Sequence, residues 1–220
     1  MDTATLNILS GPEQAPASGK VKQLILFLHG LGADGNDLIS LAPMMEKAFP
    51  DAQFCSPDAP FECDLAPFGR QWFSFREPNT DMLYNGVDAA APHLNNYIDA
   101  KLKQYNLPME KLAVIGFSQG TMTALHTFLR RPAPCAAIVG FSGAIVASGK
   151  LPAEIRCKPP VCLIHGDADN VVPFAQMADA EAALSKCGVE VEAHTEAGLA
   201  HGISPQGLEI ATNFLKRFLG

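Results

Sequence analysis

Short, continuously apolar runs alternate with longer amphipathic segments along most of this chain. A run that is apolar at every position predicts a strand covered on both faces, which is typical of parallel sheets. The amphipathic segments predict helices that pack against those faces. We therefore expect an α/β fold with a mostly parallel central sheet and helices on both faces, in a single domain over residues 1–220. The expected strands are residues 5–8, 23–28, 53–56, 112–116, 136–141, 161–165 and 190–195, and the expected helices are residues 36–48, 87–105, 119–129, 174–185 and 205–218.

Two segments depart from this regular pattern. Pro92 lies within the expected helix 87–105, so we expect that helix to start late or to kink there. Residues 58–85 are rich in Pro, Phe and Asp and contain Trp72. A long irregular stretch inside a compact domain is usually functional, which places it among the candidate site segments.

Bulk properties exclude several classes of protein. The chain has 220 residues, 48% of them hydrophobic, and a net charge of −7, which argues against a nucleic-acid partner. We find no signal-peptide pattern, and the apolar runs are too short to cross a bilayer. These features predict a soluble, cytoplasmic protein with no stable membrane insertion. The six cysteines lack metal-binding spacing and are expected to be free thiols, although a bridge at Cys63 stays open.

The sequence Gly116-Phe117-Ser118-Gln119-Gly120 lies between an expected strand and an expected helix. In that setting, Gly-x-Ser-x-Gly forms a sharp turn that lifts the serine hydroxyl out of the sheet. A Cβ atom at Gly116 or Gly120 would press on the adjoining strand and helix. The pattern predicts Ser118 as a nucleophile. A glycine-flanked surface serine is the alternative, so other residues must support this interpretation.

A nucleophilic serine needs a base and a carboxylate that orients the base. In hydrolases with this turn, the acid and then the histidine follow the serine in the chain. Asp167 and Asp169 both follow the expected strand 161–165, and Asp167 could instead bind local backbone N–H groups. His194 falls in an alternating strand pattern, whereas His201 lies in a glycine-flanked loop before the last helix. This placement favours His201 as the base and leaves two candidate acids.

The loop His29-Gly30-Leu31-Gly32-Ala33-Asp34-Gly35 directly follows the expected strand 23–28. It lacks the Lys-Ser/Thr pair of a P-loop and the spacing of a dinucleotide-binding turn. Its glycines allow backbone N–H groups to face a ligand. We expect it to supply one oxyanion donor beside the N–H of Gln119, with His29 orienting the loop.

Together, these motifs resemble the phospholipase/carboxylesterase family, which comprises bacterial carboxylesterases and acyl-protein thioesterases. The resemblance rests on the glycine loop 29–35, the serine turn 116–120, His165-Gly-Asp-Ala-Asp169 with Val171-Val-Pro173, and His201-Gly202, and it extends from about Val21 to the end. It implies an α/β-hydrolase fold that needs no cofactor or metal. The implied site residues are Ser118 as nucleophile, Asp169 as acid, His201 as base, and Leu31 and Gln119 as backbone oxyanion donors.

The resemblance also bears on the substrate and on assembly. The segment Arg70-Gln-Trp72-Phe73 is similar to the family's aromatic loop beside the acyl pocket, and residues 74–85 are more similar to bacterial carboxylesterases than to eukaryotic thioesterases. A homodimer is plausible on the same ground.

The short connection from Phe141 to Val161 leaves no room for a large cap domain, so we expect an open acyl site. Such a site suits esters of short-to-medium acyl chains. A thioesterase or lysophospholipase would use the same residues, and a non-catalytic receptor or interaction module would not need all three of Ser, Asp and His. The expected lining residues, several of which could instead belong to the core, are Leu31, Leu65, Phe68, Trp72, Phe73 and Met82.

Overall fold

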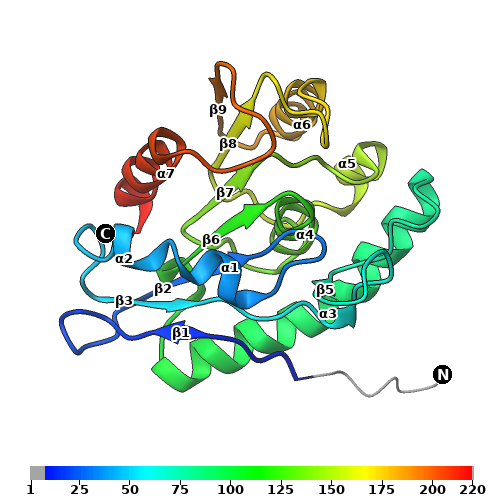
Figure 1. Ribbon diagram of the computed structural model, residues 1–220. Coiled ribbons are helices and arrows are strands. Elements are labelled where there is room, and N and C mark those ends of the chain that lie inside the picture. The colour runs from blue at the N-terminus through cyan, green and yellow to red at the C-terminus, as the bar shows by residue number, and fades with distance from the viewer. Residues whose placement is uncertain (1–7, 220) are drawn as a thin grey trace.

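The centre of the computed structural model, which describes residues 8–219, is a seven-stranded sheet in the order β1-β3-β2-β6-β7-β8-β9 (Figure 1). Every neighbouring pair is parallel except β1 and β3. The predicted mostly parallel sheet is therefore confirmed. The strands of this sheet are β1 Glu13–Gln14, β2 Gln23–Leu28, β3 Ala52–Cys55, β6 Leu112–Phe117, β7 Ala137–Phe141, β8 Val161–Gly166 and β9 Val191–Glu196.

Helices cover both faces of the sheet, as predicted (Figure 1). Successive side chains of a strand point to opposite faces. Leu24, Leu26 and Leu28 of β2 belong to a core that includes buried residues of α3, α4 and α6. Ile25 and Phe27 belong to a second core shared with α1, α2 and α7. The helices are α1 Gly35–Ile39, α2 Ala42–Met45, α3 Thr80–Tyr105, α4 Gln119–Phe128, α5 Leu151–Glu154, α6 Ala175–Lys186 and α7 Pro205–Phe218, with 3-10 turns η1 Met109–Lys111 and η2 Ser148–Lys150.

The structure tests only the last residue of the first predicted strand. Residues 5–7 of the expected strand 5–8 lie outside the described residues, and Ile8 is outside any strand and 95% exposed. The edge strand is instead β1, whose Glu13 and Gln14 pair antiparallel with Cys55 and Phe54. A two-residue strand is too short to show the alternation by which strands are predicted.

The expected helix 36–48 is two short helices, α1 and α2. Pro43 lies in the first turn of α2, where the missing proline N–H costs nothing. In a continuous helix the same proline would remove a hydrogen bond, which accounts for the break.

Helix α3 begins at Thr80, earlier than expected, and runs through Pro92 without interruption. The Asn79 side chain caps it by accepting a hydrogen bond from the Met82 N–H at 2.9 Å. The expectation of a late start at Pro92 was therefore wrong, because an asparagine cap sets the beginning of the helix. The rest of segment 58–85 contains a small hairpin of β4 Phe61–Glu62 and β5 Arg70–Gln71.

Three further expectations concern inserted elements and cysteines. The connection from Phe141 to Val161 holds only η2 and α5, so no large cap domain is inserted there. All six cysteines are free, including Cys63. Among residues 8–219, none of the helices has both the length and the apolar character needed to cross a bilayer.

The glycines beside Ser118 have the steric role that the sequence suggested. A Cβ atom at Gly116 would lie 2.6 Å from the backbone N and Cα of Thr121, and one at Gly120 would lie 1.9 Å from the Leu28 carbonyl oxygen. Between them, Ser118 adopts φ 53° and ψ −117°. Strand β6, helix α4 and strand β2 therefore meet so closely that only glycine fits on either side of the serine.

We predict that Gly120→Ala destabilises the protein by at least about 3 kcal/mol, because a backbone carbonyl cannot yield as a side chain can. For a chain of this length, that loss corresponds to a Tm lower by about 6–12 °C. Gly149→Ala is the matched control, since a Cβ atom at Gly149 meets nothing within 4 Å. Thermal unfolding followed by circular dichroism measures both variants, and equal Tm values would contradict the prediction.

Candidate active site

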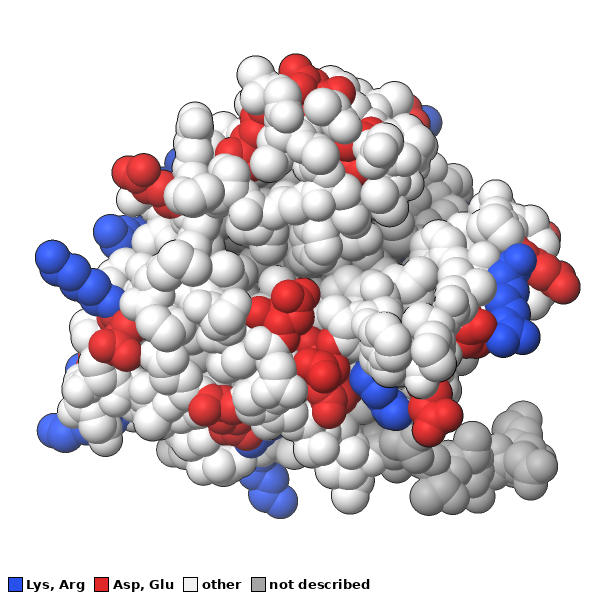
Figure 2. Space-filling view, in the orientation of Figure 1, with Lys and Arg blue, Asp and Glu red and all other residues white. Residues whose placement is uncertain are grey.

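The predicted catalytic residues lie in loops at one edge of the sheet. Ser118 directly follows β6, Asp169 follows β8 and His201 follows β9, while the glycine loop follows β2. The carboxyl ends of neighbouring parallel strands lie at the same edge, where open α/β sheets bind their ligands. In Figure 2 this face has a central hollow, and acidic side chains lie just below it in the view.

His201 and Asp169 are in direct contact. The Nδ1 atom of His201 lies 2.7 Å from Oδ2 of Asp169. A carboxylate only accepts hydrogen bonds, so Nδ1 carries the proton and donates it. In the neutral ring, Nε2 is then the atom able to accept a proton from a nucleophile.

The environment of Asp169 keeps this carboxyl ionised. Burial by itself raises its pKa, but hydrogen bonds from His201 and from the N–H groups of Val171 and Val172 outweigh burial, and the pKa lies below its ordinary value. The two backbone bonds reach Oδ1 at 2.8 and 2.9 Å. One carboxylate oxygen therefore holds the turn, and the other holds the histidine.

The other candidate acid and base lie elsewhere. Asp167 accepts a hydrogen bond from the Gly198 N–H at 2.6 Å through Oδ1, so it binds backbone, as its alternative interpretation expected. His194 lies on β9, with Nε2 3.7 Å from a Glu192 oxygen. Of the two candidate acids, only Asp169 has a hydrogen bond to His201 among the described residues.

Ser118 and His201 line the same cavity, which has a volume of about 390 Å³. Ser118 is 9% exposed, and its N–H donates to the Phe141 carbonyl at 2.9 Å. Leu31 and Gln119 line this cavity as well. The structure thus brings together the five residues predicted as the triad and the oxyanion donors, since Asp169 reaches the cavity through His201.

The glycine loop is held by a buried histidine. His29 is fully buried; its Nδ1 donates to the Gly30 carbonyl at 2.7 Å, and its Nε2 accepts from the Ala59 N–H at 3.0 Å. Burial lowers the pKa of His29, which keeps it neutral in this arrangement. In a trans peptide, the C=O and N–H groups point in opposite directions. By holding the Gly30 carbonyl, His29 sets the direction of the Leu31 N–H.

Residues 70–73 form hydrogen bonds with the glycine loop and with Gln119. The Gly32 N–H donates to the Arg70 carbonyl at 2.9 Å, and the Trp72 indole N–H donates to the His29 carbonyl at 3.0 Å. The Gln119 side chain accepts from the Trp72 N–H at 2.8 Å and donates to the Phe73 carbonyl at 2.7 Å. Gln119 therefore joins the nucleophile turn to the segment that supports the glycine loop.

The expected lining residues divide into two groups. Leu31 and Leu65 line the cavity, but Phe68, Trp72, Phe73 and Met82 do not. Trp72 and Phe73 instead belong to the core. The Trp72 indole N–H donates to the His29 carbonyl, and the Phe73 ring stacks on Phe75. Phe68, in the β4–β5 connection, is 75% exposed, and Met82, in the first turn of α3, lines a separate hollow with Ser74 and Arg76.

The sequence arguments missed several residues of the cavity. These are Phe75, Phe117, Met122, Val171 and Val172. Met122 lies one helical turn after Ser118, and the two valines lie two and three positions after Asp169, so spacing could have identified them. A second cavity of about 290 Å³, here called the side cavity, shares Phe75, Met122, Val171 and Val172 and continues to Leu83 and Ile145.

His165 is a further residue whose contacts the sequence did not reveal. This buried side chain on β8 has its Nε2 3.0 Å from the Val172 carbonyl oxygen and 3.2 Å from Oδ2 of Asp169. The carbonyl can only accept, so His165 donates from Nε2. It therefore supports the turn that presents the acid.

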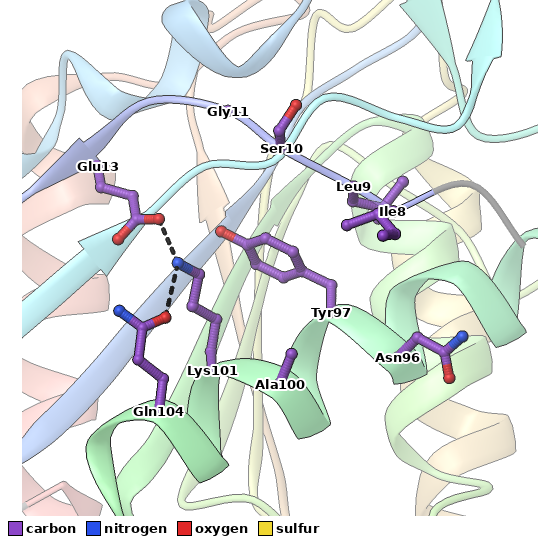
Figure 3. Close-up of a pocket in the computed structure, with 10 residues that line it drawn as sticks. All are labelled: Ile8, Leu9, Ser10, Gly11, Glu13, Asn96, Tyr97, Ala100, Lys101 and Gln104. Atoms are coloured by element: carbon purple, nitrogen blue, oxygen red, sulfur yellow. Dashed lines mark hydrogen bonds and ion pairs between the residues drawn. The ribbon is translucent and has the colours of Figure 1, made fainter.

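Other cavities and side-chain clusters lie apart from Ser118. A cavity of about 380 Å³ lies between residues 8–13 and α3, with Lys101 bound to Glu13 and Gln104 at one end (Figure 3). In the described part of the chain, we find no group of three His, Cys, Asp or Glu side chains that could hold a metal ion.

Comparison with known proteins agrees with this geometry. Residues 11–219 match the family described as phospholipase/carboxylesterase. Esterase YpfH of Escherichia coli is 29% identical over 89% of this chain and 82% of its own length, and acyl-protein thioesterase 1 of Saccharomyces cerevisiae is 29% identical over 96% and 99%. The crystal structure of esterase PE8 is 42% identical and superposes with a TM-score of 0.93, covering 97% of this chain and 100% of that one.

The matched residues include the glycine loop, the serine turn and both loops that carry the Asp169–His201 pair. The fold, with its parallel sheet and lack of a large cap, is that of an α/β hydrolase. The chain therefore belongs to the phospholipase/carboxylesterase family, and it is a carboxylesterase.

Proposed function

We propose that the protein hydrolyses carboxylic esters of short-to-medium acyl chains through Ser118, His201 and Asp169, by way of an acyl-enzyme. The observation that carries this proposal is the 2.7 Å hydrogen bond from His201 Nδ1 to Asp169, with His201 and Ser118 on one cavity. That bond gives the histidine the tautomer in which Nε2 can act as a base.

In the first half of the reaction, Ser118 Oγ attacks the ester carbonyl while His201 Nε2 takes the hydroxyl proton. The negative charge that develops on the carbonyl oxygen is stabilised by the N–H groups of Leu31 and Gln119. The Gln119 N–H is free of intrahelical bonding because Gln119 is the first residue of α4. The intermediate then collapses, and the alcohol leaves with the proton that His201 returns.

Water completes the cycle by the same route. His201 takes a proton from the water as it attacks the acyl-Ser118 carbonyl, and Ser118 leaves with that proton as the acid is released. Asp169 stays ionised throughout and stabilises the imidazolium formed in each half-reaction. Activity therefore falls on acidification, because an imidazolium cannot act as a base.

The cavities indicate a path for the acyl chain. Leu31, Leu65 and Phe75 line the main cavity beside Ser118, and the side cavity continues from it past Met122 toward Ile145. An acyl chain on Ser118 could therefore extend across Met122 into an apolar space. The mouth is open, since Leu65 is 55% and Val171 is 63% exposed, and it could admit an acyl group carried on a larger molecule.

That openness makes thioester hydrolysis the second candidate function. Acyl-protein thioesterase 1 of yeast is similar over nearly the whole chain, and the proposed residues need no change to cleave a thioester. A panel of p-nitrophenyl esters, an acyl thioester and a lysophospholipid, compared by kcat/KM, separates the candidates. A higher kcat/KM for the thioester or the lysophospholipid than for every oxygen ester would overturn the esterase proposal. A cytoplasmic location and a homodimer stay predictions.

Ser118→Ala tests the nucleophile. We expect kcat/KM for p-nitrophenyl butyrate to fall by at least about 10⁴-fold, with loss of labelling by a fluorophosphonate probe. The Tm should change by no more than about 2 °C, because alanine keeps the same Cβ atom in the same backbone turn. Wild-type protein that folds but is not labelled would rule out Ser118 as the nucleophile.

Asp169→Asn tests the acid against its neighbour. We expect a loss of about 10⁴-fold in kcat, because an amide can donate to His201 and so favour the wrong tautomer. Asp167→Asn is the matched control: its amide oxygen can still accept from Gly198, so its kcat should stay within about threefold of wild type. The reverse order of effects in steady-state kinetics would show that the acid is misassigned.

Met122→Ala tests the acyl path. Removing this side chain widens the passage to the side cavity, so kcat/KM for p-nitrophenyl octanoate should rise about five- to tenfold relative to the acetate. Met44→Ala, at a residue 62% exposed on α2, should leave the octanoate-to-acetate ratio unchanged. An unchanged ratio in Met122→Ala would mean that the acyl chain takes another path.

A further inference from the structure

His201 lies in an irregular segment, residues 197–204, between β9 and α7; we call this segment the base loop. It contains neither helix nor strand, yet it holds His201 Nδ1 at 2.7 Å from Asp169. Proton transfer needs the imidazole at a defined distance from both partners. Some other contact must therefore fix the loop.

A buried carboxylate connects its two ends. Glu196, the last residue of β9, is 7% exposed, and its Oε1 accepts a hydrogen bond from the Ser204 hydroxyl. Ser204 is the N-cap of α7, and its oxygen accepts from the Gly207 N–H at 2.9 Å. A carboxylate cannot donate and a backbone N–H can only donate, so the direction of both bonds is settled. The chain from Glu196 to Ser204 is thereby closed into a ring that contains His201.

The Glu196 carboxylate also lies against the first turn of α7. A Cβ atom at Gly207 would lie 2.5 Å from Oε2 of Glu196, so the carboxylate rests directly on the helix start. Oε2 has no hydrogen-bond partner among the described residues. A buried carboxylate oxygen without a partner costs free energy, and the positive end of the helix dipole offsets only part of that cost. A glutamate in this setting points to a role beyond packing.

Backbone bonds join the base loop to the loop of Asp169. The Glu196 carbonyl accepts from the Asp167 N–H at 3.2 Å, and the Leu199 carbonyl accepts from the Ala168 N–H at 3.1 Å. These bonds hold the first half of the base loop. The second half, which follows His201, is held at Ser204 by the Glu196 side chain.

We propose that Glu196 is a positioning residue for His201, acting through Ser204 to hold the imidazole against Asp169 and over Ser118. The inference rests on the proposed triad. Glu196 touches neither substrate nor the reacting atoms; its carboxylate sets where the base loop ends. The competing explanation is that Glu196 only stabilises the capped start of α7.

Four variants separate these explanations. Glu196→Leu removes the acceptor but leaves the Ser204 cap on Gly207, whereas Ser204→Ala removes both. Glu196→Gln keeps an oxygen that can accept from Ser204, and Ser204→Thr keeps the hydroxyl. Thr212→Val is the control, because it removes a hydroxyl of α7 that bonds only within the helix, to the Leu208 carbonyl at 2.8 Å.

We expect Glu196→Leu and Ser204→Ala to lower kcat about ten- to hundredfold with little change in KM. The acidic limb of the pH profile of kcat/KM should also move to lower pH by at least about 0.5 unit. When His201 shifts away from Asp169, the Asp169 carboxylate stabilises the protonated form of His201 less. Glu196→Gln, Ser204→Thr and Thr212→Val should keep both quantities near wild type.

Two results would overturn the proposal. One is a kcat within twofold of wild type in Glu196→Leu; the other is a reduced kcat with an unmoved acidic limb, as simple destabilisation would give. If Glu196→Leu does not fold, Ser204→Ala against Ser204→Thr gives the same comparison. Asp169→Asn, measured in parallel, distinguishes failure of the proposed triad from failure of the Glu196 proposal. Full activity of Asp169→Asn would overturn the triad. Loss of activity in Asp169→Asn together with full activity of Glu196→Leu would overturn only the role of Glu196.

Discussion

The close approach of β2, β6 and α4 around Ser118 is the constraint on which the rest of the site depends. Gly120 lies against the Leu28 carbonyl, so the chain must turn sharply before it. Ser118 makes this turn with a positive φ, and helix α4 begins at the next residue. That start places the Gln119 side chain where it binds the backbone of Trp72 and Phe73. Trp72 in turn holds the His29 carbonyl. One backbone contact thus positions both Ser118, the proposed nucleophile, and the glycine loop.

Much of this arrangement could be predicted because it depends on local sequence. Apolar runs mark strands, the Gly-x-Ser-x-Gly pattern marks the turn at Ser118, and parallel strands bring Asp169 and His201 to one edge. The interior of helices was less predictable. Nothing in the run 36–48 forces a break except Pro43. Asn79 was not recognised as the cap of α3 because the first turns of that helix are exposed, and its first buried residue is Val87.

The lining of the cavity could not be predicted from residue type. Trp72 and Phe75 are both aromatic residues of one segment. Trp72 is buried, with its indole N–H bonded to the His29 carbonyl, whereas Phe75 lines the cavity. The difference comes from a partner more than forty positions away in the chain, which the pattern of the segment does not encode. Val171 and Val172 line the cavity, and their N–H groups bind Oδ1 of Asp169, so the turn that holds this carboxylate also places the two side chains.

The three carboxylates near His201 differ in what their surroundings let them do. Asp169 accepts hydrogen bonds from His201 and from the N–H groups of Val171 and Val172, which lower its pKa, so it stays ionised and can stabilise a positive imidazole. Asp167 is exposed and binds one backbone N–H, so solvent screens its charge and it acts mainly as a tether. Glu196 is buried against α7 and bonds only to a hydroxyl, so its effect is geometric. The three side chains thus have separate tasks: Asp169 stabilises the charged imidazole, Asp167 binds the backbone of the base loop, and Glu196 fixes the end of that loop. The base loop can therefore hold His201 in place without secondary structure, because no single contact must do all three.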